Sequence, residues 1–172
     1  MKKTVFLVGG RCAGKSVVGA RLAGLLGLEL FDIDVYIGSI TGMTVADIVA
    51  RDGWVGYRRL EAETLKKAKA EGMVVAPGGG IVLSPASRIF MRDTGVVVYL
   101  AAPAHVLAKR MAALDELSQR PSLTGKHPLD EIAEVMEQRE PLYRSAAHYV
   151  VDASKSIDEV ADSIIKILAK IS

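Results

Sequence analysis

The sequence predicts an α/β fold built on a mostly parallel sheet, and three observations support this fold. Short apolar runs alternate along the 172 residues with longer segments of helical periodicity, which is the pattern of strand–helix–strand units. The first run, residues 4–8, passes directly into a glycine-rich turn. The run at residues 96–100 is apolar throughout, as expected of a central strand buried on both faces. With no repeat or linker-like stretch, residues 1–172 are expected to form one domain.

The first elements follow one another closely. The strand at residues 4–8 precedes a helix over residues 15–26, whose apolar residues recur at helical spacing on one face. Gly27 is the stop signal for that helix. Residues 30–32 then form a short second strand.

The middle of the chain predicts two helices and a third strand. Thr44 and Asp47 have the spacing of a capping box, so a helix is expected to begin there and to end near Gly53. A longer helix is expected over about residues 56–72. The strand at residues 73–76 is stopped by a proline and three glycines.

The C-terminal half completes the fold. Strands are expected at residues 96–100 and 149–151. Between them, a long helix has its apolar face marked by Leu129, Ile132, Met136 and Tyr143. Ser156 and Glu159 form a second capping box. The closing helix follows with an apolar face of Ile157, Val160, Ile164, Ile167, Leu168 and Ile171.

Composition excludes several classes of protein. Lys and Arg total 22 against 20 Asp and Glu, and the net charge of +2 does not favour nucleic acid or an anionic membrane as a partner. Cys12 is the only cysteine, so no internal disulfide can form. The first apolar run is too short for a signal peptide, and no segment has the length and apolarity of a membrane span. A cytoplasmic protein with an aliphatic core is expected.

Residues 9–16 match the phosphate-loop pattern G-x-x-x-x-G-K-S/T. The glycines let backbone N–H groups point at a phosphate, and the following helix presents its N-terminus. Lys15 can then reach the β- and γ-phosphates, and Ser16 can offer its hydroxyl to Mg²⁺. A glycine-rich turn without a ligand is the alternative. Since a strand precedes the pattern and an amphipathic helix follows it, the sequence predicts an ATP-dependent small-molecule kinase.

The sequence gives little support for a catalytic thiol or for a metal site made of histidines. Cys12 lies inside the loop, either as a redox or catalytic thiol or as a small residue filling a position. The second interpretation is favoured, because no histidine lies nearby in sequence to activate the thiol. The three histidines, His105, His127 and His148, do not have metal-ligand spacing.

Asp32 and Asp34 follow the second strand, at the edge where ligands of parallel sheets gather. In an extended segment both side chains would point to the same side. One carboxylate could hold Mg²⁺ through water, and the other could hold a substrate hydroxyl. The alternative is an acid pair at a helix N-terminus without a chemical role.

Arginines and a second glycine cluster are further candidates. Arg58 precedes Glu61 by three residues, which also fits an exposed ion pair. Arg139 continues the apolar face of its helix, so it needs an anionic partner unless its side chain snorkels outward. Three consecutive glycines, Gly78, Gly79 and Gly80, suggest close backbone approach to a ligand, although a flexible loop is possible.

Residues 115–126 are polar and lie between two helical patterns. A long surface loop and a lid over the site are both consistent with this position. Position alone favours neither. The Arg120-Pro121 pair favours a lid, over about residues 112–126, only through the family resemblance given next.

Taken together, these motifs resemble the shikimate kinase family over about residues 5–152. The motifs are residues 9–16, Asp32-Ile33-Asp34, Arg58 with Glu61, the glycine triplet, Arg120-Pro121, and Arg139 with Pro141-Leu142-Tyr143. Residues 43–49 and the Trp54 region are more similar to the second enterobacterial isozyme type than to the first. The resemblance implies a P-loop fold of the nucleoside-monophosphate-kinase type, with five parallel strands in the order 2-3-1-4-5. It also implies phosphorylation of shikimate by ATP, with ADP and shikimate 3-phosphate as products.

The resemblance implies a role for each matched residue. ATP would bind to Cys12, Ala13, Gly14, Lys15, Ser16 and Val17, and to Arg120 of the lid. Ser16 and Asp32 would serve Mg²⁺. Asp34 would bind substrate hydroxyls and is the candidate base, while Arg58, Arg139 and the glycines at 78–80 would hold shikimate. Lys15, Asp34 and Arg120 would be the catalytic residues. A monomer is expected.

Two positions depart from the pattern of the family. Cys12 stands where the family usually has glycine or another very small residue. Pro77 stands where threonine or another small residue often precedes the glycine triplet, and proline removes a backbone donor. Gluconate kinase, which shares the loop, and a catalytically silent nucleotide-binding regulator are the alternative functions.

Overall fold

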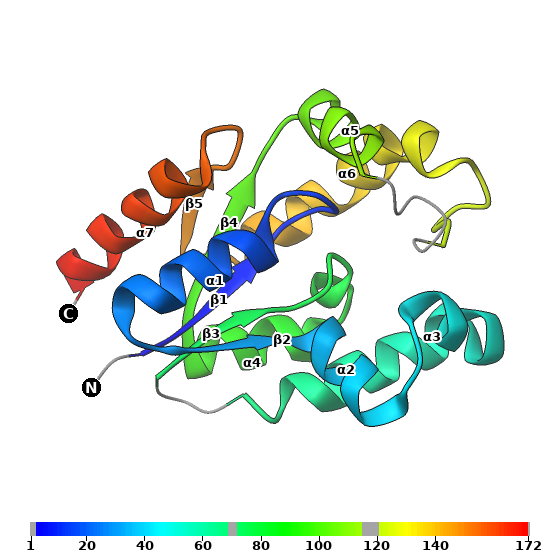
Figure 1. Ribbon diagram of the computed structural model, residues 1–172, viewed down its shortest axis with the longest axis horizontal. Coiled ribbons are helices and arrows are strands. Elements are labelled where there is room, and N and C mark those ends of the chain that lie inside the picture. The colour runs from blue at the N-terminus through cyan, green and yellow to red at the C-terminus, as the bar shows by residue number, and fades with distance from the viewer. Residues whose placement is uncertain (1–2, 69–71, 115–120, 172) are drawn as a thin grey trace.

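A parallel five-stranded sheet forms the centre of the molecule (Figure 1). The computed structural model describes residues 3–68, 72–114 and 121–171. The strands are β1 (Thr4–Val8), β2 (Glu29–Asp32), β3 (Met73–Ala76), β4 (Gly95–Ala101) and β5 (Tyr149–Asp152). They lie in the order β2-β3-β1-β4-β5, and all neighbouring pairs are parallel. The predicted fold class and strand order are confirmed.

Helices cover both faces of this sheet. α1 (Lys15–Leu26) and α7 (Ile157–Ile171) pack together on one face, and α4 (Pro85–Thr94) and α6 (Pro128–Ala146) pack on the other. Beyond the carboxyl ends of the strands lie α2 (Ile33–Thr41), α3 (Val45–Leu65) and α5 (Ala104–Ala112) (Figure 1). A short 3₁₀ turn, η1 (Ile81–Leu83), follows β3.

The core is mainly aliphatic, as the composition predicts. Every residue of β1 and β3 is buried, and so are the five central residues of β4. Three tyrosines, Tyr57, Tyr99 and Tyr143, are also almost completely buried. Their hydroxyls donate hydrogen bonds to Asp34, Glu140 and the carbonyl of Gly79, respectively. Each buried hydroxyl therefore has the acceptor that it needs.

The helices differ from the prediction in two places. The predicted break near Gly53 is confirmed, because non-helical backbone angles there (φ 69°, ψ 175°) kink α3 into two helical parts. The predicted extension of the second helix to residue 72 is wrong, because the helix ends at Leu65 and turn hydrogen bonds replace helical ones up to Ala68. α2 and α4 were not predicted. α4 carries a readable start signal, since Ser84 caps it and Pro85 is its first residue.

Taken alone, none of the helices among the described residues has the length and apolarity to cross a bilayer. Only α2 and α3 taken together, bent at 100° to each other, reach that length and composition.

Candidate active site

A cavity of about 990 Å³ lies at the carboxyl ends of the strands. Its size suits a nucleotide together with a small second substrate. Segments far apart in sequence line it: the loop after β1, the β2–α2 junction, α3, the turn after β3, and α6. Its position is the one expected for ligands of a parallel sheet.

The loop after β1 wraps around the amino group of Lys15. Lys15 Nζ donates hydrogen bonds to the carbonyls of Gly9 and Gly10, at 2.9 and 2.8 Å. Gly14 is the N-cap of α1 at a φ of 96° and has no side chain to cap the helix. The N-terminus of α1, which no side chain caps, therefore borders the cavity and favours an anion there. The predicted strand–loop–helix setting of residues 9–16 is present.

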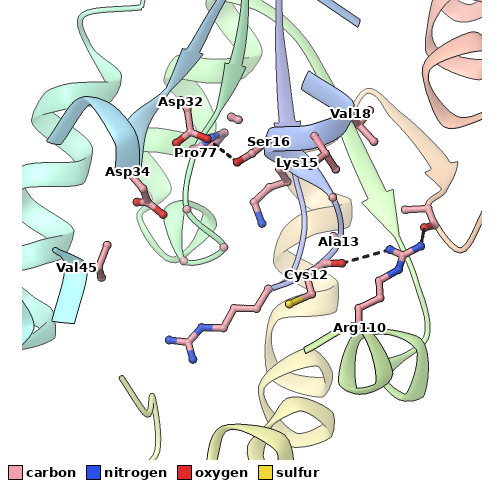
Figure 2. A pocket seen from close by; sticks show the side chains of 18 of the residues that line it. Cys12, Ala13, Lys15, Ser16, Val18, Asp32, Asp34, Val45, Pro77 and Arg110 are labelled. Atoms are coloured by element: carbon pink, nitrogen blue, oxygen red, sulfur yellow. Dashed lines mark hydrogen bonds between the residues drawn. The ribbon is translucent and has the colours of Figure 1, made fainter. Parts of the chain in front are cut away.

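Arg110 supports the loop from α5, and the sequence analysis did not find it. Its guanidinium donates to the carbonyl of Cys12 at 3.3 Å and to the carbonyl of Ala153 at 2.6 Å (Figure 2). Arg110 also lines the cavity. It thus links the phosphate loop to the segment after β5. In sequence, Arg110 looked like any polar residue of an amphipathic helix.

Ser16 and Asp32 form a pair beside the loop. Ser16 Oγ donates to Asp32 Oδ2 at 2.5 Å. Asp32 is also the N-cap of α2, because its Oδ1 accepts from the Val35 N–H at 3.2 Å. The hydroxyl and carboxylate thus lie together, next to the place where the loop would hold phosphates.

Asp34 reaches the cavity by a different geometry from the one predicted. The expectation of an extended segment is wrong, because Asp34 lies in the first turn of α2. The acid pair at a helix N-terminus, the alternative interpretation, describes the local backbone correctly. Both carboxylates nevertheless point toward the space that Ser16 and Lys15 face (Figure 2). Asp34 accepts a hydrogen bond from Tyr57, a residue that the sequence analysis did not single out.

Arg58 and Glu61 form an ion pair in the wall of the cavity, not on the surface. Arg58 Nη1 lies 2.9 Å from Glu61 Oε2, and Glu61 is only 1% exposed. Burial raises the pKa of Glu61, and the adjacent Arg58 charge partly opposes that rise. Glu61 Oε1 has no hydrogen-bond partner among the described residues. The pair fixes the position of Arg58, which lines the cavity.

The glycine triplet approaches the protein's own side chains. A Cβ atom on Gly78 would lie 2.4 Å from Glu61 Oε1, and one on Gly80 would lie 2.1 Å from Arg58 Cζ. Between them, the carbonyl of Gly79 accepts from the Tyr143 hydroxyl at 2.6 Å. Close approach was predicted, but with a ligand as the partner. The structure shows that the glycines leave room for the Arg58–Glu61 pair.

Arg139 enters the cavity from α6. It is 8% exposed and lines the cavity, so it does not snorkel to the surface. Its charge reaches two groups: it opposes the rise that burial causes in the pKa of Tyr143, and it acts the same way on Glu61. Arg58 and Arg139 therefore place two positive charges around one part of the cavity. The buried Glu61 carboxylate is influenced by both charges.

The segment after residue 120 is anchored by a buried carboxylate. Glu131, 1% exposed, accepts hydrogen bonds from Ser122, Leu123 and Thr124. Arg11 donates to the Pro121 carbonyl at 2.8 Å, and Trp54 Nε1 donates to the Ser122 carbonyl at 2.9 Å. Sequence reasoning did not identify the anchoring roles of Arg11 and Trp54, because their partners are 110 and 68 positions away along the chain. Glu131 lies seven to nine positions from its partners and was not singled out either. Arg120 and residues 115–119 of the predicted lid lie outside the described residues.

Comparisons with known proteins agree on one family. The family model described as shikimate kinase matches residues 11–169. A protein of Syntrophotalea carbinolica named shikimate kinase 2 is 48% identical over 170 residues, covering 99% of each chain. One of Sodalis glossinidius with the same name is 49% identical over 166 residues, covering 96% of this chain and 95% of the relative.

Solved structures show the same similarity. A shikimate kinase of Acinetobacter baumannii in complex with shikimate superposes with a TM-score of 0.92 at 32% identity, covering 100% of this chain and 96% of the other. A gluconokinase of Sinorhizobium meliloti reaches a TM-score of 0.57 at 18% identity, which is a likeness of fold alone.

Proposed function

The chain belongs to the shikimate kinase family, and from this premise we propose that it transfers the γ-phosphoryl group of ATP to the 3-hydroxyl of shikimate. The products are ADP and shikimate 3-phosphate, on the route to chorismate and the aromatic amino acids. The observation that carries the proposal is that one cavity is lined by both the phosphate loop and the residues expected to hold the acceptor. A phosphate loop faces a pocket that Asp34, Arg58 and Arg139 line together, and shikimate is an anion with three hydroxyls.

The loop side of the cavity binds ATP. Backbone N–H groups of residues 12–17 and the amino group of Lys15 hold the phosphates. Lys15 now bonds to two loop carbonyls, and it exchanges one of them for a phosphate oxygen when ATP binds. We assign Arg120, which lies outside the described residues, to the ATP phosphates.

The opposite side holds the acceptor. Arg58 and Arg139 bind the shikimate carboxylate, since a guanidinium and a carboxylate can form two parallel hydrogen bonds. Asp34 accepts from the hydroxyl that attacks. Phosphoryl transfer depends on alignment and charge neutralisation more than on a strong base, so Asp34 mainly orients the nucleophilic oxygen. The turn at residues 78–80 borders the shikimate ring.

Ser16 and Asp32 fit a magnesium ion. Mg²⁺ in kinases is bound by one or two protein oxygens together with phosphates and water, and a hydroxyl beside a carboxylate supplies such oxygens. No group of three or more acidic, histidine or cysteine side chains gathers as a metal site in the part of the chain that the structure describes. This agrees with an ion held largely by the nucleotide. When bound, Mg²⁺ would neutralise charge on the β- and γ-phosphates.

ADP release tests the function directly. A coupled assay should show ADP formation that depends on shikimate and on Mg²⁺, with little turnover on gluconate as the control acceptor. Turnover with gluconate and none with shikimate would contradict the proposal. ATP binding without transfer to either acceptor would identify a silent regulator instead.

We also propose that residues 1–172 act as one catalytic domain and as a monomer, with a lid at about residues 112–126. A cytoplasmic location is proposed as well. The single cysteine and the small net charge support an intracellular enzyme that acts on small molecules. Gel filtration with light scattering tests the monomer, with and without both substrates.

A further inference from the structure

Tyr57 is the described residue that donates a side-chain hydrogen bond to Asp34. It lies on α3 and lines the cavity, although only 2% of its surface is exposed. The ring has little freedom to move. Trp54 packs edge-on against it at 5.8 Å between ring centres, and the Arg58 guanidinium lies 5.5 Å from the centre of the Tyr57 ring.

The hydroxyl of Tyr57 serves no need of packing. A phenylalanine would make the same ring contacts, whereas a buried hydroxyl requires an acceptor. That acceptor is Asp34 Oδ1, the carboxylate assigned to the nucleophilic hydroxyl. Burial and the nearby carboxylates of Asp34 and Glu61 raise the pKa of Tyr57 far above its ordinary 10.0. The phenol therefore stays protonated at neutral pH and remains a donor to Asp34.

A carboxylate by itself is poorly oriented. The terminal torsion of an aspartate is broad, and Asp34 stands at the first turn of a helix that borders the open cavity. A donor fixed on a rigid ring holds one oxygen in place. The second oxygen is then presented to the substrate with its lone pairs in a defined direction.

We infer that Tyr57 is a positioning residue for phosphoryl transfer, which holds Asp34 Oδ1 so that Oδ2 receives and aligns the attacking hydroxyl of shikimate. The inference rests on the proposed function and deepens it. Tyr57 thus affects the rate of phosphoryl transfer and takes no part in binding ATP.

A double-mutant cycle with Asp34 tests this role. Y57F should lower kcat about tenfold, while the KM values for shikimate and ATP stay within about twofold. D34N should remove most turnover and leave ATP binding nearly intact. Because Tyr57 acts through Asp34, adding Y57F to D34N should change the remaining rate by less than about twofold.

Tyr99→Phe is the matched control. Tyr99 is also fully buried and also donates to a carboxylate, that of Glu140, but it is not part of the cavity wall. Y99F should therefore keep the wild-type kcat. A comparable loss in Y99F would show that Y57F acts through general stability and would overturn the inference.

The remaining outcomes are equally decisive. The positioning role would be overturned if Y57F left kcat unchanged, or if it raised the KM for shikimate at full kcat. It would also be overturned if Y57F lowered the rate equally in wild-type protein and in D34N. Wild-type protein without shikimate-dependent ADP formation would overturn the proposed function, and the inference with it. An active wild type with a full-rate Y57F would overturn the inference alone.

Discussion

Cys12 has a φ of 61°, which places its backbone in the left-handed region, and it is the only non-glycine residue among those described to do so. For an ordinary side chain this conformation costs about 1–2 kcal/mol. The shikimate kinase family usually has glycine or a very small residue here, and the backbone conformation supplies a physical reason. The strain lies within the phosphate loop, where Arg110 holds the Cys12 carbonyl.

Replacing Cys12 separates backbone strain from thiol chemistry. C12G should raise the free energy of unfolding by about 0.5–1 kcal/mol, because glycine adopts this φ freely but loses more chain entropy on folding. C12S should keep both the strain and the activity. Urea denaturation of the three proteins measures the first effect. A C12G variant no more stable than C12S would contradict it.

Alkylation reports on the thiol at the same position. Only proteins that retain Cys12, which lines the cavity, should lose activity to iodoacetamide, and ATP should protect them. An inactive C12S variant would mean that the thiol itself is needed.

At the scale of elements, the turn after β3 packs closely against helix α3. The positions of Gly78 and Gly80 are determined by Glu61 and Arg58, two residues on one face of α3. Glu61 is buried with one oxygen lacking a hydrogen-bond partner among the described residues. Such a group tolerates little displacement, so the turn and the helix act as one unit that fixes Arg58.

Gly78→Ala tests this unit. The added methyl group would overlap Glu61 Oε1, with 2.4 Å between the two atoms, and would push the Arg58–Glu61 pair out of place. The KM for shikimate should rise about tenfold or more, while the KM for ATP changes little. Gly24→Ala is the control, since a methyl group there meets nothing within 4 Å in helix α1. Equal kinetics for the two variants would refute the packing argument.

Glu131 plays a comparable part at the start of α6. Burial alone would raise its pKa, but hydrogen bonds from Leu123, Thr124 and Ser122 outweigh burial and hold the pKa below its ordinary 4.5. A carboxyl whose pKa is lowered by folding stabilises the protein above its ordinary pKa. That contribution is lost as the pH falls through the lowered value.

Glu131→Gln should therefore destabilise the protein in a pH-dependent way. At neutral pH the free energy of unfolding should fall by about 1–3 kcal/mol, since buried donors lose a charged acceptor. The difference from wild type should shrink as the pH drops below 4.5. Glu134→Gln, which removes an exposed pair with Lys126, should leave the free energy of unfolding nearly unchanged. Thermal unfolding between pH 3 and 7 measures both; a difference independent of pH would contradict the role of the charge.

At the scale of the whole molecule, two different helices bring Arg58 and Arg139 to the cavity. Arg58 is carried by α3 and Arg139 by α6, and they are 81 positions apart in sequence (139 − 58). The sheet order places the loop after β1 between these helices. The sheet topology thus brings the phosphate loop and both arginines to one cavity.

Arg139→Ala should raise the KM for shikimate about tenfold or more, because a charge-assisted pair with the carboxylate is lost. The KM for ATP should stay within about twofold. Arg144→Ala is the control on the same helix, since Arg144 forms an exposed pair with Glu140. An unchanged shikimate KM in R139A would count against the carboxylate role.

Local patterns made much of the fold predictable. The phosphate loop, the capping boxes at Thr44 and Ser156, and the wholly apolar β4 depend on interactions between residues near in sequence. Such interactions are encoded by spacing and residue type alone. The strand order and the acceptor came from the family resemblance, because neither parallel pairing nor ligand identity has a local signal.

Only the tertiary structure decided how the acceptor side is built. Asp34 lies in a helix and bonds to Tyr57, and the glycine triplet makes room for Arg58 and Glu61. The contacts of Asp34 with Tyr57 and of the glycines with α3 join residues at least seventeen positions apart (78 − 61). A local sequence pattern therefore cannot predict them. The sequence by itself determined that this chain handles phosphate, because a phosphate loop is one continuous segment. The structure determined that Asp34, Arg58 and Arg139 line one pocket beside that loop, because the pocket exists only once distant elements pack together.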